Sequence, residues 1–217
     1  MSFFFPLSTS RRRVVTRIRQ SAKKMTDAGF DAIVFEDALE AWCDQLNRIG
    51  IDVSSAANAA AGGGSNAAVG AEPLTLPELE AASGEDSGGL ADMGVMLLRL
   101  LTSAELRSRA DFFTPFVLGQ DDDNRICDVP SFCARRVEPM GCESDHVHIV
   151  ALTDALGVGV RVEYLDRSEE EGAAEGGRGG SGGGNPNHHD FVPEGAGSPP
   201  SVVLLYRPGH YDILYPI

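Results

Sequence analysis

The last seventeen residues, Ser201–Ile217, decide how the end of this 217-residue chain folds, and they read SVVLLYRPGHYDILYPI. Val202–Tyr206 is a continuous run of β-branched, apolar and aromatic residues, which predicts a strand buried on both faces. Arg207–Gly209 carries turn chemistry, because proline presets φ and glycine accepts a positive φ. His210–Tyr215 then alternates between two sets of side chains, as a strand with two distinct faces does. The stretch therefore predicts a tight β-hairpin.

The return strand of this hairpin carries two residues with chemical potential, His210 and Asp212, on the same face. Side chains at positions i and i+2 of a strand lie about 6–7 Å apart at Cα. A carboxylate at that spacing can bond one imidazole nitrogen and fix the tautomer, which leaves the other nitrogen to take a proton from a nucleophile. A histidine and an aspartate on the surface of an edge strand give the same pattern, and spacing alone does not decide between the two interpretations.

Further segments turn this pattern into a family resemblance. The matching segments are Arg99–Ser103, Phe112–Phe113, Val137–Met140, Glu143–His148, Val162–Arg167 and Leu204–Tyr215. Together they resemble the C-terminal half of the otubains, deubiquitinating cysteine proteases of the OTU family, in a register that extends back to about Arg17. In that family the histidine of this hairpin is the general base, and the aspartate two residues later orients it. The resemblance implies these catalytic roles for His210 and Asp212.

The resemblance leaves the nucleophile unassigned. In otubains the nucleophilic cysteine lies in an Asp-Gly-Asn-Cys loop upstream of every segment matched here, and this chain contains no such tetrapeptide. Cys133 and Cys142 lie in segments that match family positions outside the active site, Cys127 lies in an expected loop and Cys43 in an expected core helix. No nucleophile is identified in this chain. The resemblance therefore implies a papain-like OTU fold whose N-terminal helix and nucleophile loop are missing.

Hydrophobic periodicity predicts helices followed by a small antiparallel sheet, an α+β domain. The expected helices are Val14–Gly29, Glu36–Ile49, Gly88–Phe113 with a break at Thr102–Ser103, and Val147–Leu156, with a short helix within 73–84. Pro115 is expected to stop the third of these soon after its end. Val158–Leu165 alternates as a strand. Trp42 is expected in the core.

One domain is expected, covering 17–217 as a partial otubain-like unit behind a poorly defined basic N-terminus at 1–16. Two low-complexity stretches, at about 53–71 and 168–187, interrupt it, and neither can bury enough apolar surface to offset its ordering entropy. His188 and His189 border the second stretch and are expected to be exposed to solvent. His146 and His148 fall in the first turn of a helix capped by Asp145, where a structural role is expected.

Charge and composition exclude several classes of function. The formal net charge is −14, from 32 acidic and 18 basic residues, and the first 25 residues hold seven of the basic residues and no acidic one, so the remainder is more acidic still. Such an acidic body argues against nucleic acid, whose binding requires a basic footprint. An acidic body suits a partner with a basic face, such as ubiquitin. The sequence has no secretory signal and no apolar run of the ~18 residues that span a bilayer. Four cysteines without a disulfide spacing are typical of reduced thiols, so we expect a cytoplasmic or nuclear protein that binds neither nucleic acid nor membrane.

No cofactor or metal is expected. The acidic turn at 119–124 lacks the alternating ligands, central glycine and terminal glutamate of a calcium loop. Cysteines and histidines gather between Cys127 and His148, but no cysteine pair has the C-x₂₋₄-C spacing of structural zinc sites.

Two functions of different classes follow from these observations. The first is a cysteine-type deubiquitinase that hydrolyses isopeptide bonds at the ubiquitin C-terminus, represented here by a truncated chain. The second is a catalytically inactive otubain-like protein that binds ubiquitin or a ubiquitin-conjugating enzyme. The intact His210/Asp212 pair favours the first, since a retired site has no chemical need for either residue. A third possibility is a chain that lacks too much of its core to fold stably.

Overall fold

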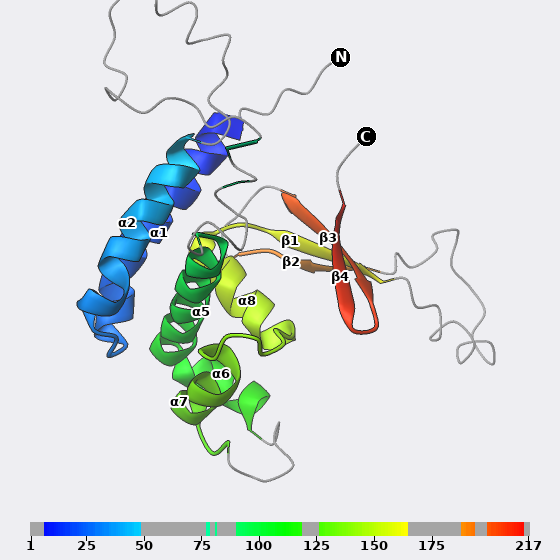
Figure 1. Cartoon of the computed structure of the whole chain (residues 1–217). Helices are drawn as coiled ribbons and strands as arrows, with labels where there is room; N and C mark the ends of the chain where they lie inside the picture. Colours follow the sequence, from blue (N-terminus) through cyan, green and yellow to red (C-terminus); the bar gives the residue numbers. More distant parts are fainter. Residues whose placement is uncertain are drawn as a thin grey trace, which may run out of the picture. The chain divides into compact units, whose positions relative to one another are not determined.

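The computed structural model describes residues 7–48, 77–78, 81, 90–118, 126–164, 188–193 and 199–214. The chain forms two compact units that divide after Leu156, the first helical and the second built on a β-sheet (Figure 1). The two low-complexity stretches and the acidic turn at 119–124 lie largely or wholly outside the described residues, as does most of the short helix expected within 73–84. No helix in the described ranges is long and apolar enough to cross a membrane.

The first two helices, α1 (Leu7–Asp27) and α2 (Ala32–Arg48), pack side by side (Figure 1). The chain reverses between them at Gly29, whose φ of 95° is one that glycine adopts without strain. Helix α1 begins before the predicted start at Val14, because arginine and serine continue a helix without contributing to the apolar period.

Helix α5 (Leu90–Ser108) contributes to both hydrophobic cores of the helical unit. The first core lies between α1, α2 and α5, and Trp42 packs against it as predicted. The predicted break at Thr102–Ser103 is wrong, since α5 is continuous through both residues. The Thr102 hydroxyl donates to the carbonyl oxygen of Leu98 at 2.7 Å, and the Ser103 hydroxyl donates to the carboxylate of Glu138. Neither side chain therefore interrupts the backbone hydrogen bonds of the helix.

The second core joins the end of α5 to α6 (Ala110–Val117), α7 (Val129–Phe132), the π-helical turn η2 (Cys133–Val137) and α8 (His146–Leu156). Its large side chains are fully buried and include Leu106, Phe113 and Phe132. Pro115 lies inside α6, which continues to Val117, so the prediction that Pro115 ends the helix is wrong.

The sheet has four strands in the order β2–β1–β3–β4, formed by β1 (Val160–Tyr164), β2 (His188–Phe191), β3 (Val202–Arg207) and β4 (His210–Leu214). It is mixed and not purely antiparallel as predicted, because β1 and β3 run parallel. The chain leaves β1, returns as β2 on one side of it, and crosses to form β3 on the other side. The α+β class is confirmed.

The strand registers give this sheet one apolar and one polar face. Val162 and Phe191 lie on the apolar face and are buried. The polar face carries a two-point ion pair in which Arg161 donates to both carboxylate oxygens of Asp190. Strand β3 is half-buried along Val202–Tyr206, so the prediction of a strand buried on both faces is wrong.

Candidate active site in the terminal hairpin

Strands β3 and β4 form the predicted hairpin, with Arg207 directly opposite His210 across a turn made by Pro208 and Gly209. Gly209 has φ of 77°. Proline at the first central position and a glycine of positive φ at the second are the signature of a type II turn. The turn thus places the side chain of the last residue of β3 beside that of the first residue of β4, on the same face.

His210 and Asp212 are in contact on that face, as the spacing predicted. The Nε2 atom of His210 lies 3.1 Å from Oδ1 of Asp212. In the neutral imidazole this contact fixes the tautomer with the proton on Nε2, which donates to the carboxylate. Nothing among the described residues hydrogen-bonds to Nδ1, so its lone pair is available as a base.

A third side chain, which sequence reasoning treated only as part of the turn, completes the cluster. Arg207 donates from Nη2 to Oδ2 of Asp212 at 2.9 Å. Asp212 thus gives one carboxylate oxygen to His210 and the other to Arg207. The hydrogen bond from His210 is the main cause that holds the pKa of Asp212 below its ordinary value; desolvation opposes it, and the charge and hydrogen bond of Arg207 add a smaller lowering. Arg207 lies directly opposite His210 in a hairpin with a two-residue turn, and this position is the sequence signal that could have identified it.

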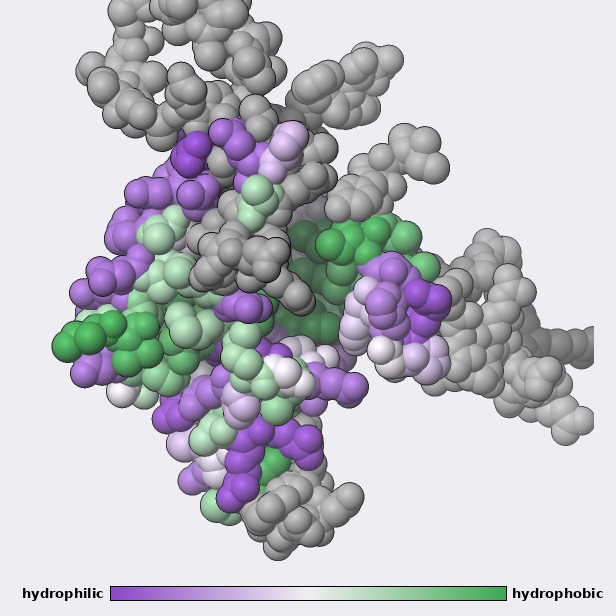
Figure 2. Space-filling model, in the orientation of Figure 1, coloured by the Kyte–Doolittle hydropathy of each residue, from purple (hydrophilic) through white to green (hydrophobic). Residues whose placement is uncertain are grey.

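The cluster is open to solvent. The side chains of Arg207, His210 and Asp212 are 51 %, 58 % and 43 % exposed. Figure 2 shows hydrophilic residues gathered at the tip of the β3–β4 hairpin, with hydrophobic residues farther along the strands. Side chains this exposed are accessible to a large molecule, and among the described residues the contacts that orient His210 and Asp212 are those within the cluster.

The four cysteines all belong to the helical unit and form no disulfide. Cys43 and Cys133 are fully buried, and burial raises the pKa of both thiols. A raised pKa lowers the thiolate fraction at neutral pH, so neither has the character of an activated nucleophile. Cys127 is exposed and Cys142 half-exposed. The geometry assigns the role of nucleophile to none of the four.

The other histidines divide between structural and peripheral positions. His148 is buried, with Nδ1 2.7 Å from Oδ1 of Asp145 and Nε2 3.3 Å from the carbonyl oxygen of Arg136. This confirms the structural interpretation of His148. His189 is exposed as predicted, whereas His188 begins β2 and is half-buried, because the sheet extends to it.

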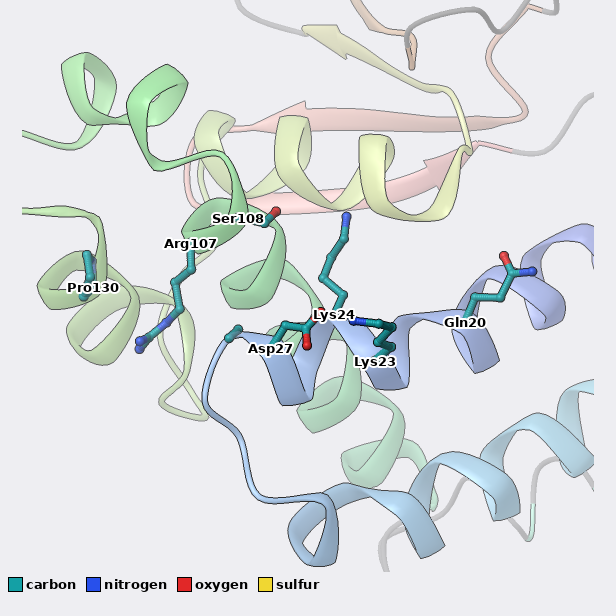
Figure 3. A pocket seen from close by; sticks show the side chains of 8 residues that line it. Gln20, Lys23, Lys24, Asp27, Arg107, Ser108 and Pro130 are labelled. Carbon is teal, nitrogen blue, oxygen red and sulfur yellow. Dashed lines mark hydrogen bonds and ion pairs between the residues drawn. The ribbon is translucent and has the colours of Figure 1, made fainter.

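The helical unit also contains an open groove of about 560 Å³ (Figure 3). The cations that line it already have partners: Lys23 pairs with Asp27, Lys24 with Glu105, and Arg107 with Glu138. None of the predicted catalytic residues lines this groove. Within the described part of the chain, no group of three or more histidine, cysteine or acidic side chains is arranged to hold a metal ion.

Comparison with known proteins places this geometry in context. The family model described as Peptidase C65 Otubain matches residues 77–216. The OVARIAN TUMOR DOMAIN-containing deubiquitinating enzyme 1 of Arabidopsis thaliana is 39 % identical over 211 residues, which cover 94 % of this chain and 58 % of that protein. The human ubiquitin thioesterase OTUB1 is 48 % identical over 125 residues, covering 58 % of this chain and 38 % of that protein.

Solved structures share the fold. A complex of OTUB1 with ubiquitin aldehyde and UBC13~Ub superposes with a TM-score of 0.66 at 24 % identity, over 94 % of this chain and 64 % of that one. The chain thus spans about three fifths of the length of the Arabidopsis relative and of this OTUB1 chain. The family match extends over most of the sequence and includes the whole hairpin that carries His210 and Asp212. This chain therefore belongs to the otubain family and has its α+β OTU fold.

Proposed function

We propose that the protein is a cysteine-type deubiquitinase, which hydrolyses the isopeptide bond between the ubiquitin C-terminus and a lysine amine. The observation that carries this proposal is the His210–Asp212 contact of 3.1 Å on β4, with Nδ1 of His210 unoccupied by the described residues. That arrangement is a base with its orienting carboxylate, which is what acyl transfer to a thiol requires.

The geometry of the pair supports the following roles for His210 and Asp212 in the proposed reaction. Nδ1 of His210 takes the proton of a cysteine thiol, and the thiolate attacks the isopeptide carbonyl carbon. The imidazolium then gives that proton to the departing lysine amine, leaving a thioester that water hydrolyses. Asp212 holds the ring by Nε2–H and stabilises the imidazolium charge. The thiol is the component that these 217 residues leave unassigned.

The partners of this chemistry are ubiquitin, ubiquitin conjugates and ubiquitin-conjugating enzymes. The OTUB1 structures that share the fold contain ubiquitin aldehyde together with UBC13~Ub or UBCH5B~Ub. The net charge of −14 suits a partner with a basic face. The proposed compartment is the cytoplasm or nucleus, which cysteines without a disulfide support.

The test uses ubiquitin carrying a C-terminal thiol-reactive electrophile and intact-mass analysis. We expect the native protein, isolated from its cells through an antibody to this chain, to form one stoichiometric adduct. His210→Ala introduced at the genomic locus abolishes that adduct and turnover of ubiquitin conjugates, whereas His189→Ala, a change to an exposed histidine of β2, preserves both. Wild-type turnover in the His210→Ala protein would overturn the assignment.

The alternative is a catalytically inactive otubain that binds ubiquitin or a ubiquitin-conjugating enzyme. The OTUB1 structures that share the fold contain ubiquitin aldehyde together with UBC13~Ub or UBCH5B~Ub, which also fits a binding role. Native protein that binds ubiquitin but forms no adduct would support this alternative. An adduct with the recombinant 217-residue chain that is lost in His210→Ala would instead locate the nucleophile at one of its four cysteines.

A further inference from the structure

We propose that Arg207 is a positioning residue of the catalytic pair: its guanidinium holds Oδ2 of Asp212, so that Oδ1 stays on Nε2 of His210. The proposal rests on the proposed function of His210 as base. Arg207 ends β3 directly opposite His210, and its Nη2 lies 2.9 Å from Oδ2 of Asp212. It touches the orienting residue and not the base, so it acts on catalysis through Asp212.

The need for such a contact follows from exposure. Asp212 is 43 % exposed, and His210 is 58 % exposed. A single hydrogen bond between two side chains that solvent can reach competes with water and leaves the carboxylate rotamer weakly determined. A second hydrogen bond from the opposite strand fixes the carboxylate at both oxygens, which restricts where the imidazole can lie.

The same sheet contains an arginine–aspartate pair of different geometry, which shows what an ordinary pair looks like. Arg161 donates to Oδ1 of Asp190 at 2.6 Å and to Oδ2 at 2.8 Å, so the guanidinium occupies both oxygens. Arg207 occupies only one oxygen of Asp212 and leaves the other to His210. A carboxylate shared in this way is expected where Arg207 holds Asp212 in place and Asp212 in turn orients the imidazole of His210.

Within the described residues of the hairpin, few charged side chains lie near Asp212. Strand β3, which packs against β4, has Arg207 as its single charged residue, and Leu205 lies directly opposite Asp212. On β4 itself the other titratable residues are His210 and Tyr211, and Tyr211 lies on the opposite face with Tyr206. Arg207 is therefore the charged side chain of β3 that pairs with Asp212.

The first test follows the carboxyl carbon of Asp212 by NMR titration of the 217-residue chain. We expect Arg207→Ala to raise the pKa of Asp212 toward its ordinary value and Arg207→Lys, which keeps the charge, to raise it less. Arg161→Ala is the matched control: it raises the pKa of Asp190, whose own lowering comes mainly from Arg161, and leaves Asp212 unchanged. The proposal would be overturned if Arg207→Ala leaves the pKa of Asp212 unchanged while Arg161→Ala raises the pKa of Asp190.

The second test separates positioning from structure in a form of the protein that cleaves ubiquitin conjugates. We expect Arg207→Ala to lower kcat by about tenfold with KM little changed, since misplacing a catalytic group by a fraction of an ångström costs rate. Arg207→Lys recovers part of the loss, and Arg161→Ala retains wild-type kcat. Unchanged kcat in Arg207→Ala would refute a positioning role. A wild-type protein without activity would overturn the proposed function, and the titration would still show whether Arg207 holds Asp212.

Discussion

The hydroxyl of Ser103, on helix α5, donates a hydrogen bond of 2.7 Å to Oε1 of Glu138, the residue that follows η2. Arg107 donates to the same oxygen at 2.7 Å from Nη2 and to the Ser103 hydroxyl at 3.1 Å from Nε. The three side chains form a closed network between two helical elements. Ser103 is completely buried, so each of its hydrogen bonds replaces one that water would otherwise make.

Ser103→Ala is expected to lower the free energy of unfolding by about 1–2 kcal/mol, because it removes the hydrogen bond that Oε1 of Glu138 accepts from Ser103 and leaves Nε of Arg107 without its acceptor. Chemical denaturation of the purified chain measures this. Ser108→Ala is the control, since that hydroxyl is exposed and donates to a carbonyl of its own helix. Its effect should stay within about 0.5 kcal/mol. Equal effects of the two substitutions would show that the network contributes nothing.

Gly94 provides a second prediction, because a methyl group there would meet the indole of Trp42. A Cβ built on Gly94 lies 2.6 Å from Nε1 and 2.8 Å from Cε2 of Trp42. Alanine is intrinsically preferred over glycine within a helix by about 1 kcal/mol, but overpacking a rigid neighbour costs about 1–3 kcal/mol. We expect Gly94→Ala to destabilise the helical unit in thermal denaturation.

The control for Gly94→Ala removes the neighbour. In a Trp42→Ala background the same substitution meets no indole, so it should stabilise the protein through helix propensity alone. If Gly94→Ala has the same effect in both backgrounds, the close approach of α5 to α2 does not determine the choice of glycine.

The parts of the structure that could be predicted are those determined by residues that are close together in the sequence. The hairpin, its turn and the shared face of His210 and Asp212 follow from strand periodicity and from the chemistry of Pro208 and Gly209. Helix α5 follows from its dense apolar period. Each of these depends on residues close together in the chain, which is the kind of pattern that a single sequence expresses.

The parts that the sequence did not predict depend on partners distant in the chain. The break expected at Thr102–Ser103 reflects the helix propensity of hydroxyl residues, and the contact with Glu138 overrides that propensity. The parallel pairing of β1 with β3 depends on a crossover past β2, which no local pattern reports. Arg207 was overlooked because turn chemistry already accounted for its segment.

Asp145 gives a pH-dependent prediction. Its Oδ1 accepts from the backbone N–H of Val147 at 3.0 Å and lies 2.7 Å from Nδ1 of His148. Partial burial by itself raises the pKa of Asp145, but the hydrogen bond and charge of His148 outweigh burial and hold the pKa below its ordinary value. When folding lowers the pKa of a carboxyl group, the folded state is stabilised at pH values at which the carboxylate is ionised in both the folded and the unfolded state. For an aspartate this is above about pH 4.

That stabilisation should disappear as the pH falls through the lowered pKa of the folded state. The measurement is the free energy of unfolding of wild type, Asp145→Asn and Asp145→Ala between about pH 7 and about pH 2. Asparagine keeps the helix cap and removes the charge, so its difference from wild type should shrink toward zero in acid. Alanine removes the cap as well as the charge, so it should cost about 1 kcal/mol more than asparagine at every pH. A pH-independent difference between wild type and Asp145→Asn would contradict the role of charge.

The cysteines give the last prediction, which bears on the search for the nucleophile. Alkylation by iodoacetamide follows the thiolate fraction and the exposure of each thiol. Burial raises the pKa of the Cys43 and Cys133 thiols, so they should remain unmodified in the native chain at neutral pH, and raising the pH should not expose them. Cys127 is exposed and should react first, followed by the half-exposed Cys142. Peptide mass analysis after a timed reaction gives this order.

The denatured chain is the control, since all four thiols should react there at similar rates. Rapid native alkylation of Cys43 or Cys133 would mean that the helical unit opens around one of its two cores, because each thiol lies in a different core. It would also make that cysteine a candidate partner for His210. Protection of both confines any nucleophile among these 217 residues to Cys127 or Cys142, which Cys127→Ser and Cys142→Ser then test separately against the ubiquitin electrophile.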